Sequence, residues 1–157
     1  MNVSAEFVNY GSFDKMITDY IAVFKSAKKP FTSVLSYWWN WNKEHIYNRT
    51  TSGMYEDLTE GYKDFKEDAV GFIYPILKFD GVLEASITGN QSPYSVATIK
   101  DDELIMGTVA EKDGIPYPIY LFRSGRSPVV KTKDQMDAFA KIFFATALNE
   151  FKKIRKS

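Results

Sequence analysis

Residues suited to catalysis are scarce in this chain, which has one histidine, His45, and no cysteine. The lack of cysteine excludes thiolate nucleophiles, disulfides and thiolate metal ligands, so a metal site would need His45 together with carboxylates. No second histidine stands three or four residues from His45, and the glycine patterns of nucleophile elbows, phosphate loops and dinucleotide sites are missing. We therefore interpret His45 as a half-buried packing residue and expect no metal and no other cofactor.

Carboxylates are plentiful, and they are the other groups that could hold a metal ion. One set, Asp101-Asp102-Glu103, falls at a turn, and a longer acidic stretch runs from Glu56 to Asp68. A metal-dependent nuclease usually combines such carboxylates with a lysine on the adjacent strand of a hairpin. Near Asp80 and Glu84 the matching position, 86, is a serine. We interpret these acids as solvated turns and helix surface, and favour a protein that is not an enzyme.

Basic residues are concentrated late in the chain, although 20 bases and 20 acids balance to a net charge of zero. A basic stretch that ends at a predicted helix N-terminus could bind phosphate, because the first helical amides and the helix dipole favour an anion. Together with the cationic end of the last helix, it could contact a nucleic-acid backbone. The candidate anion contacts lie within residues 123–133 and are Arg123, Arg126, Lys131 and Lys133.

The most unusual local feature is a cluster of three tryptophans within residues 38–41. Tryptophan and tyrosine dominate protein-binding hot spots because they bury a large rigid area and keep a polar atom for hydrogen bonding. At 100° per residue these rings cannot all face one way on a helix. They either fill the space between a helix and a sheet or form an exposed surface or cavity wall. The candidate binding surface comprises Tyr37, Trp38, Trp39, Trp41, His45 and Tyr47.

Apolar residues at helical spacing predict three helices before residue 70. The first should run from Ser12 to Lys29 and end at Pro30. The second should begin at Thr32 or Ser33 and reach about residue 45. The third should span about residues 54–66, with Tyr55, Leu58, Tyr62 and Phe65 facing inward.

Residues 70–122 have the composition and turns of an antiparallel sheet. Asp80-Gly81 between two apolar runs is typical of a tight hairpin and predicts strands over residues 70–79 and 82–88. A second hairpin over 94–110 should turn at Asp101-Asp102, which pairs Lys100 with Glu103. A fifth strand is predicted over 115–122, at an edge of the sheet because of its prolines.

A long amphipathic helix is predicted at the C-terminal end. Thr132 and Gln135 fit a capping box, in which a threonine side chain accepts a hydrogen bond from the amide three residues later. The predicted fold class is therefore α+β. It comprises N-terminal helices, a five-stranded antiparallel β-meander and a C-terminal helix packed on the sheet, in one globular domain over residues 1–157.

We expect a non-catalytic accessory protein that binds another protein as a regulator or inhibitor. A homodimer that matches acidic and basic ends is one arrangement of such surfaces. One alternative is a nucleic-acid-associated protein that uses the 123–133 loop and the C-terminal helix. Another is a small-ligand binder or enzyme with an aromatic-walled cavity between the second helix and the sheet.

The expected location is the cytoplasm, away from any membrane. We find no secretory signal and no apolar run of the length that spans a bilayer. The small, cysteine-free and aromatic-rich composition is also compatible with a phage or mobile-element protein.

Overall fold

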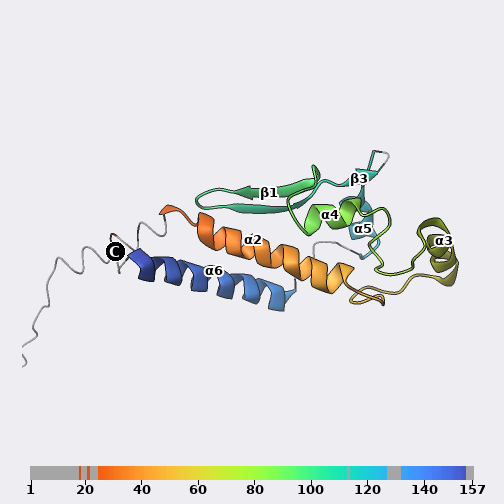
Figure 1. Cartoon of the computed structure of the whole chain (residues 1–157), viewed down its shortest axis with the longest axis horizontal. Coiled ribbons are helices and arrows are strands. Elements are labelled where there is room, and N and C mark those ends of the chain that lie inside the picture. The colour runs from red at the N-terminus through yellow and green to blue at the C-terminus, as the bar shows by residue number, and fades with distance from the viewer. Residues whose placement is uncertain (1–17, 19–20, 22–24, 113, 127–131, 155–157) are drawn as a thin grey trace, which may run out of the picture.

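The computed structural model describes residues 18, 21, 25–112, 114–126 and 132–154. Most of the helix predicted from Ser12 to Lys29 lies outside these ranges. A central helix has a β-hairpin and a short helix on one side and a long helix on the other (Figure 1). The elements are α2 (Lys28–Asn42), the π-helix η1 (Lys43–Tyr47), α3 (Glu60–Val70), α4 (Val82–Ile87), β1 (Ser95–Ile99), β2 (Leu104–Thr108), β3 (Glu111–Lys112), β4 (Ile115–Pro116), α5 (Tyr117–Arg123) and α6 (Lys133–Ile154).

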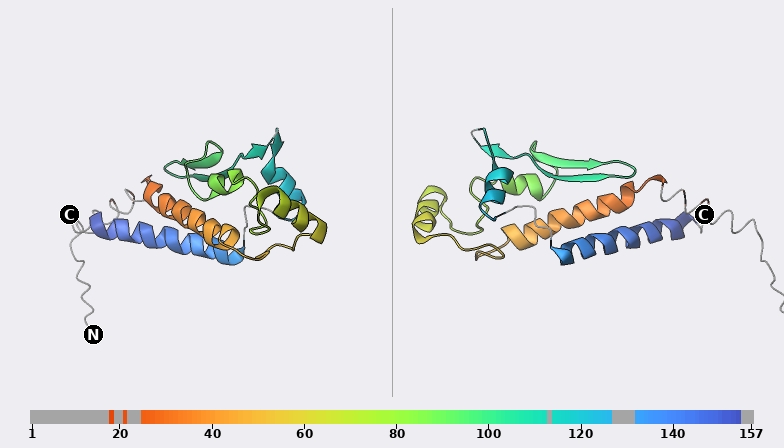
Figure 2. Two further views of the ribbon diagram at one scale, coloured as in Figure 1. Left: turned by 45° about the vertical axis from the view of Figure 1, so that its right-hand side comes forward. Right: turned by 180° about the vertical axis from the view of Figure 1, so that it is seen from behind.

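Helix α2 lies at the centre of this arrangement, between α6 and the β1–β2 hairpin (Figure 2). Its buried residues include Val34, Leu35 and Trp38, which recur at helical spacing. Trp38 is only 1% exposed. Beyond its last residue, Asn42, the chain continues into the π-helical turn, and the Asn42 side chain donates to the carbonyl of Ile87 in α4 at 2.9 Å.

The start of α2 differs from the prediction. The helix begins at Lys28, and the hydroxyls of Thr32 and Ser33 donate back to carbonyls four residues earlier instead of capping it. Pro30 lies in the first turn, where a helix needs no N–H group, so it permits the helix rather than ending the preceding one.

Helix α6 confirms the predicted long C-terminal helix. Thr132 Oγ1 accepts a hydrogen bond from the amide of Gln135 at 3.1 Å, as the capping pattern predicts. The predicted packing on the sheet is wrong, because α6 packs on α2. The ring centroids of Phe31 and Phe143 lie 5.2 Å apart across this contact. The apolar side of α6 therefore completes the core beneath α2.

The hairpin predicted over residues 94–110 is confirmed. Strands β1 and β2 pair antiparallel, with Ile99 opposite Leu104, and the amide of Lys100 donates to the carbonyl of Glu103 at 2.8 Å. A two-stranded hairpin is marginal alone in water, so it needs a partner surface. Contacts with α2 and α4 provide one.

The five-stranded meander is wrong. The β1–β2 sheet has two strands, and the short β3–β4 pair forms a separate two-stranded ladder. Residues 72–81 form no strand. The contact that replaces strand pairing comes from a side chain of α3. The ammonium of Lys66 binds the carbonyls of Ile73, Pro75 and Ile76, which a sheet would need as acceptors. Pro75 also lacks an N–H donor.

The Asp80-Gly81 turn leads into a helix instead of a second strand. Gly81 takes the positive φ of 83° that the sequence indicates, but it is the N-cap of α4. Asp80 Oδ1 accepts a hydrogen bond from the amide of Val82 at 3.1 Å, which supports the first turn. The buried residues of α4 then have helical spacing, and they are Leu83, Ser86 and Ile87.

The strand predicted over 115–122 is also wrong beyond its first two residues. Strand β4 ends at Pro116, and α5 begins at the next residue. A proline in the first turn of a helix loses no helical hydrogen bond, whereas two prolines would remove donors from a strand. Pro118 occupies such a position in α5.

Helix α3 begins later than predicted and exposes its rings. It spans Glu60–Val70, and Tyr62 and Phe65 are exposed rather than inward. Lys66 is the buried residue of this helix. Among the described residues, no helix is long and apolar enough to cross a membrane.

Replacing Trp38 with alanine should lower the free energy of unfolding by about 3–5 kcal/mol, because a large side chain is removed from the core beside α2. Urea denaturation followed by circular dichroism measures this change. The matched control is Ile105→Ala, on an exposed position of β2, which should change stability by less than about 1 kcal/mol. Equal losses in the two variants would contradict the central position of Trp38.

Candidate functional site

The predicted tryptophan cluster is distributed around α2. Trp38 and Tyr47 are buried in the core, and Trp39 and Trp41 are half-buried and pack against it. Most of this aromatic area therefore joins α2 to its neighbours. It is not available as one continuous binding surface.

Tyr37 and His45 lie at two other places. The Tyr37 ring meets the Phe139 ring of α6 edge-on, with centroids 5.9 Å apart. His45 is exposed, not half-buried, and stacks on Trp41 at 4.6 Å with the ring planes 5° apart. Its Nδ1 lies 3.0 Å from the Trp41 carbonyl oxygen. The structure thus brings together Trp41 and His45 from the predicted set.

Two tyrosines beside the tryptophan cluster have raised pKa values, and they are the buried Tyr47 and the half-buried Tyr55. Burial, with smaller contributions from Tyr55 and Glu84, raises the pKa of Tyr47 well above its ordinary value. Burial also raises the pKa of Tyr55 to about 12. Both phenols therefore stay protonated at neutral pH and act as core side chains.

The predicted basic residues are also separated. Arg123 is exposed at the end of α5, and Lys133 is exposed in the first turn of α6. Lys131 lies outside the described residues. Arg126 is half-buried and lines a cavity beside α5.

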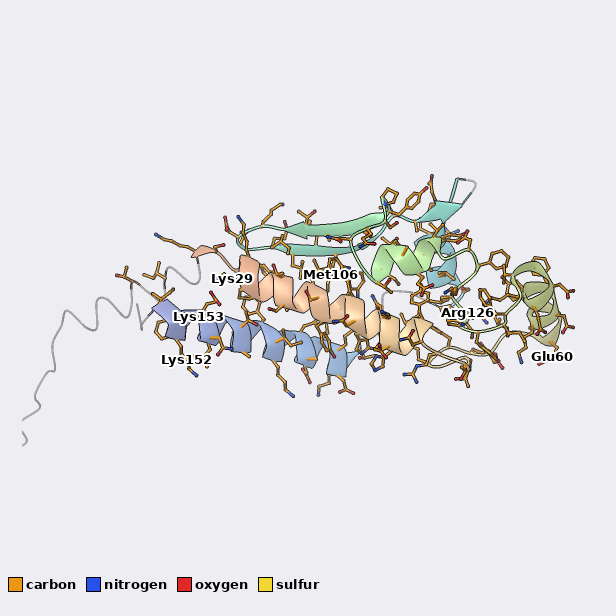
Figure 3. All side chains as sticks on the ribbon, in the orientation of Figure 1. Lys29, Glu60, Met106, Arg126, Lys152 and Lys153 are labelled. Carbon is orange, nitrogen blue, oxygen red and sulfur yellow. The ribbon has the colours of Figure 1, made fainter. Side chains whose placement is uncertain are left out.

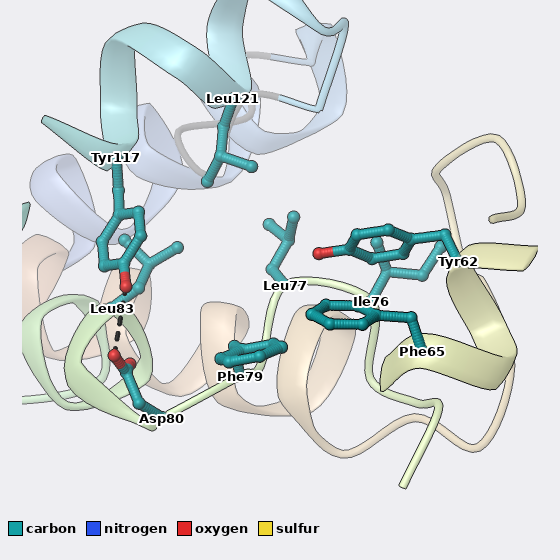
Figure 4. A pocket seen from close by; sticks show the side chains of 9 residues that line it. All are labelled: Tyr62, Phe65, Ile76, Leu77, Phe79, Asp80, Leu83, Tyr117 and Leu121. Atoms are coloured by element: carbon teal, nitrogen blue, oxygen red, sulfur yellow. Dashed lines mark hydrogen bonds between the residues drawn. The ribbon is translucent and has the colours of Figure 1, made fainter. Parts of the chain in front are cut away.

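That cavity belongs to a groove between α3, the segment before α4, and α5, which we call the α3–α5 groove. It consists of two adjoining cavities of about 250 and 240 Å³, of which Figure 4 shows the first. Both cavities are lined by Tyr62, Ile76, Leu77 and Leu121. The first also has Phe65, Phe79, Asp80, Leu83 and Tyr117, and the second also has Leu58, Thr59, Ser124 and Arg126.

One wall of the groove is a row of three aromatic rings. The ring centroids of Tyr62 and Phe65 lie 5.8 Å apart, and those of Phe65 and Phe79 lie 6.4 Å apart. Tyr62 is 45% exposed and Phe65 is 55% exposed. In Figure 4 the Tyr62 hydroxyl points into the cavity toward Leu77. This wall of the groove therefore offers a large apolar surface and the phenol group of Tyr62.

The opposite wall is fixed by a hydrogen bond between α5 and the start of α4. The Tyr117 hydroxyl donates to Asp80 Oδ2 at 3.1 Å (Figure 4). Because Asp80 also accepts a hydrogen bond from the amide of Val82, its carboxylate connects α5 to the start of α4. This arrangement holds Leu121 of α5 across from the aromatic wall.

The floor of the groove depends on the buried Lys66, which is 1% exposed. Its Nζ donates to the carbonyls of Ile73, Pro75 and Ile76 at 2.6, 2.7 and 3.2 Å. It also lies 5.4 Å from the centre of the Phe72 ring. Three acceptors occupy the three protons of the ammonium, so we assign Lys66 a structural role, in which it fixes the segment that carries the groove floor.

Within the described part of the chain, no three histidine or acidic side chains gather in a way that could hold a metal ion. Comparison of the chain with protein-family models, curated proteins and solved structures finds no match.

Sequence reasoning missed this groove. It placed Tyr62 and Phe65 in the core, and it placed Phe79 and Tyr117 on strands. One available signal is the composition of α3. Only four of its eleven residues have apolar or aromatic side chains, and they are Tyr62, Phe65, Ala69 and Val70. A helix this polar buries little of its surface, so aromatic rings on it are candidates for exposure.

Lys66→Met should lower the free energy of unfolding by about 3 kcal/mol, because several buried carbonyls lose their donor.

The pH dependence of the wild-type free energy of unfolding is a sharper test of the buried ammonium. Burial lowers the pKa of Lys66 to about 8, whereas an unfolded lysine titrates near its ordinary value of about 10.4. The unfolded state therefore binds more protons between these values, and stability should rise as pH rises from about 8.

Urea denaturation at several pH values from 7.5 to 9.5 measures how the free energy of unfolding changes with pH. The rise with pH should occur in the wild type and be absent in Lys66→Met, with Lys152→Met on the exposed side of α6 as control. A wild-type stability that is flat or falls in this range, relative to Lys66→Met, would exclude the lowered pKa.

Proposed function

We propose that this chain is a non-catalytic accessory protein of the regulator or inhibitor type, and that it binds another protein through the α3–α5 groove. The tryptophan cluster, our first candidate surface, serves mainly to pack α2. The row formed by the exposed rings of Tyr62 and Phe65 and the half-buried ring of Phe79 carries the proposal.

Two properties of this row support protein binding. Exposed aromatic rings that gather around a groove are typical of interaction sites, since their burial on binding is favourable and costs little side-chain entropy. The row is also supported by fixed backbone, because Lys66 binds the segment beneath it and the Tyr117–Asp80 hydrogen bond holds the facing wall.

The shape of the groove suits neighbouring side chains of a partner protein, because each of its two adjoining cavities, at about 250 and 240 Å³, has room for one or two side chains. Taken together, the two cavities also reach the usual volume of a small-molecule site, about 300–1,000 Å³. A small-ligand binder with an aromatic-walled cavity is the second candidate, and the rings around the first cavity favour it.

Several finer points belong to the same proposal. A cytoplasmic location is supported by the lack of cysteine, and a phage or mobile-element origin agrees with the composition. A homodimer that matches acidic and basic ends belongs to the proposal as one arrangement of the charged surfaces. Nucleic-acid binding through residues 123–133 has less support, because Arg126 lines the groove instead of extending the basic surface.

Selection of random peptides, displayed with free carboxyl termini, against the immobilised full chain should enrich groove-binding sequences. Phe65→Ser should weaken their binding by at least about tenfold, because the central ring of the aromatic wall is lost. The measurement is fluorescence anisotropy with the enriched peptides. Thermal unfolding should remain near that of the wild type, because Phe65 is exposed.

The matched control is Phe144→Ser, which removes a phenyl group that is 63% exposed on α6, away from the groove. This variant should bind the peptides as the wild type does. Failure to enrich any peptide, or equal affinity for the wild type and Phe65→Ser, would contradict the proposed function.

A further inference from the structure

We propose that the α3–α5 groove binds the carboxyl terminus of a partner protein whose last residue is large and apolar, and that Arg126 binds the terminal carboxylate. This inference rests on the proposed function and names the partner segment. The observation behind it is that most N–H groups of the Arg126 guanidinium have no acceptor within the described residues.

Arg126 lines the second cavity and lies between α5 and α3 (Figure 3). Its side chain makes one hydrogen bond within the described residues, from Nη2 to the backbone carbonyl of Asp57, and this bond is long at 3.4 Å. Its Nε is buried without a partner. A buried donor that lacks an acceptor is costly, so a carboxylate placed there would be stabilised by the positive charge and by unused N–H groups.

The side chain of Asp57 does not neutralise Arg126. Asp57 Oδ2 lies 3.0 Å from Lys63 Nζ, and Oδ1 accepts hydrogen bonds of 2.8 Å from the Tyr74 hydroxyl and from the amide of Leu58. These contacts, with the Tyr74 hydroxyl contributing most, hold the pKa of Asp57 below its ordinary value. Asp57 is therefore already paired as a carboxylate, and it offers Arg126 only its carbonyl group.

The backbone fixes Arg126 at the end of the groove. Gly125 has a φ of 71°, a left-handed conformation that favours glycine after a helix. The amide of Arg126 then donates to the carbonyl of Leu121 at 2.8 Å, which is the hydrogen bond of a Schellman motif. Arg126 and Leu121 line the same cavity as a result.

The rest of the groove suits an apolar side chain next to that carboxylate. The two cavities share Tyr62, Ile76, Leu77 and Leu121, so a group near Arg126 continues directly into the aromatic first cavity. In a C-terminal residue, the side chain and the carboxylate are attached to the same Cα atom. One such residue can therefore fill the apolar cavity and reach the guanidinium, and the Tyr62 hydroxyl is a second donor at the groove.

The test uses the full chain and a fluorescein-labelled hexapeptide, Ser-Gly-Ser-Gly-Ser-Phe, with either a free carboxylate or a C-terminal amide. Anisotropy should give at least about tenfold tighter binding of the acid, because the amide loses the charge-assisted hydrogen bonds. Arg126→Gln should reduce this preference to less than about twofold. The matched control is Arg123→Gln, an exposed arginine of α5, which should keep the preference.

A small carboxylate, 3-phenylpropanoate, serves as the competitor that separates a peptide from a free ligand. It should compete at least about tenfold more weakly than the peptide acid, since it lacks the peptide backbone. Equal affinity of the two would overturn the assignment to a protein terminus. No binding of either peptide, or an acid preference that survives in Arg126→Gln, would also overturn it.

One result would separate this inference from the proposed function. If the acid and the amide bind equally and both are lost in Phe65→Ser, the carboxylate assignment is wrong and the groove remains a protein-binding surface. If enriched peptides bind equally well to Phe65→Ser, the proposed function fails as well.

Discussion

The burial of α2 from two sides is the constraint on which the rest of this structure depends. The helix packs against α6 on one side and against the β1–β2 hairpin on the other. A two-stranded hairpin and a single helix are at best marginally stable in water, so each is stabilised by this shared core. Trp38, fully buried, and Asn42, whose side chain bonds to α4, connect the layers. The aromatic richness of α2 is thus explained by its having several neighbours at once.

A second constraint acts at the end of the molecule that holds the groove. There, little regular structure supports the chain between α3 and α4, and a single ammonium takes the place of a ladder of hydrogen bonds. Lys66 gathers three carbonyls of one segment. The backbone is thereby satisfied without a neighbouring strand, and this leaves apolar rings on α3 and the next segment uncovered. The exposed aromatic wall and the buried lysine are two aspects of the same local arrangement.

The sequence predicts the elements whose stabilising contacts are local. The second hairpin, the capping of α6 by Thr132 and most of α2 follow from turn chemistry and apolar spacing. The first hairpin fails although Gly81 has the positive φ that the prediction requires, because a lysine from another helix binds the carbonyls that the strand would need as acceptors. The groove could not be predicted for the same reason. Of the candidate site residues, Arg126 alone lines it, and its neighbours come from three separate segments.

The antiparallel packing of α2 and α6 has a consequence for how the molecule can be attached to something else. Lys29, near the start of α2, pairs with Glu150 near the end of α6, so these two helix ends lie together (Figure 3). Helix α3 stands at the opposite end of the molecule (Figure 1). A tether joined beyond α6 would therefore hold the body by one end and direct the α3–α5 groove outward. The protein could therefore be immobilised on a bead, or attached to a larger assembly, through this end while the groove at the other end stays accessible.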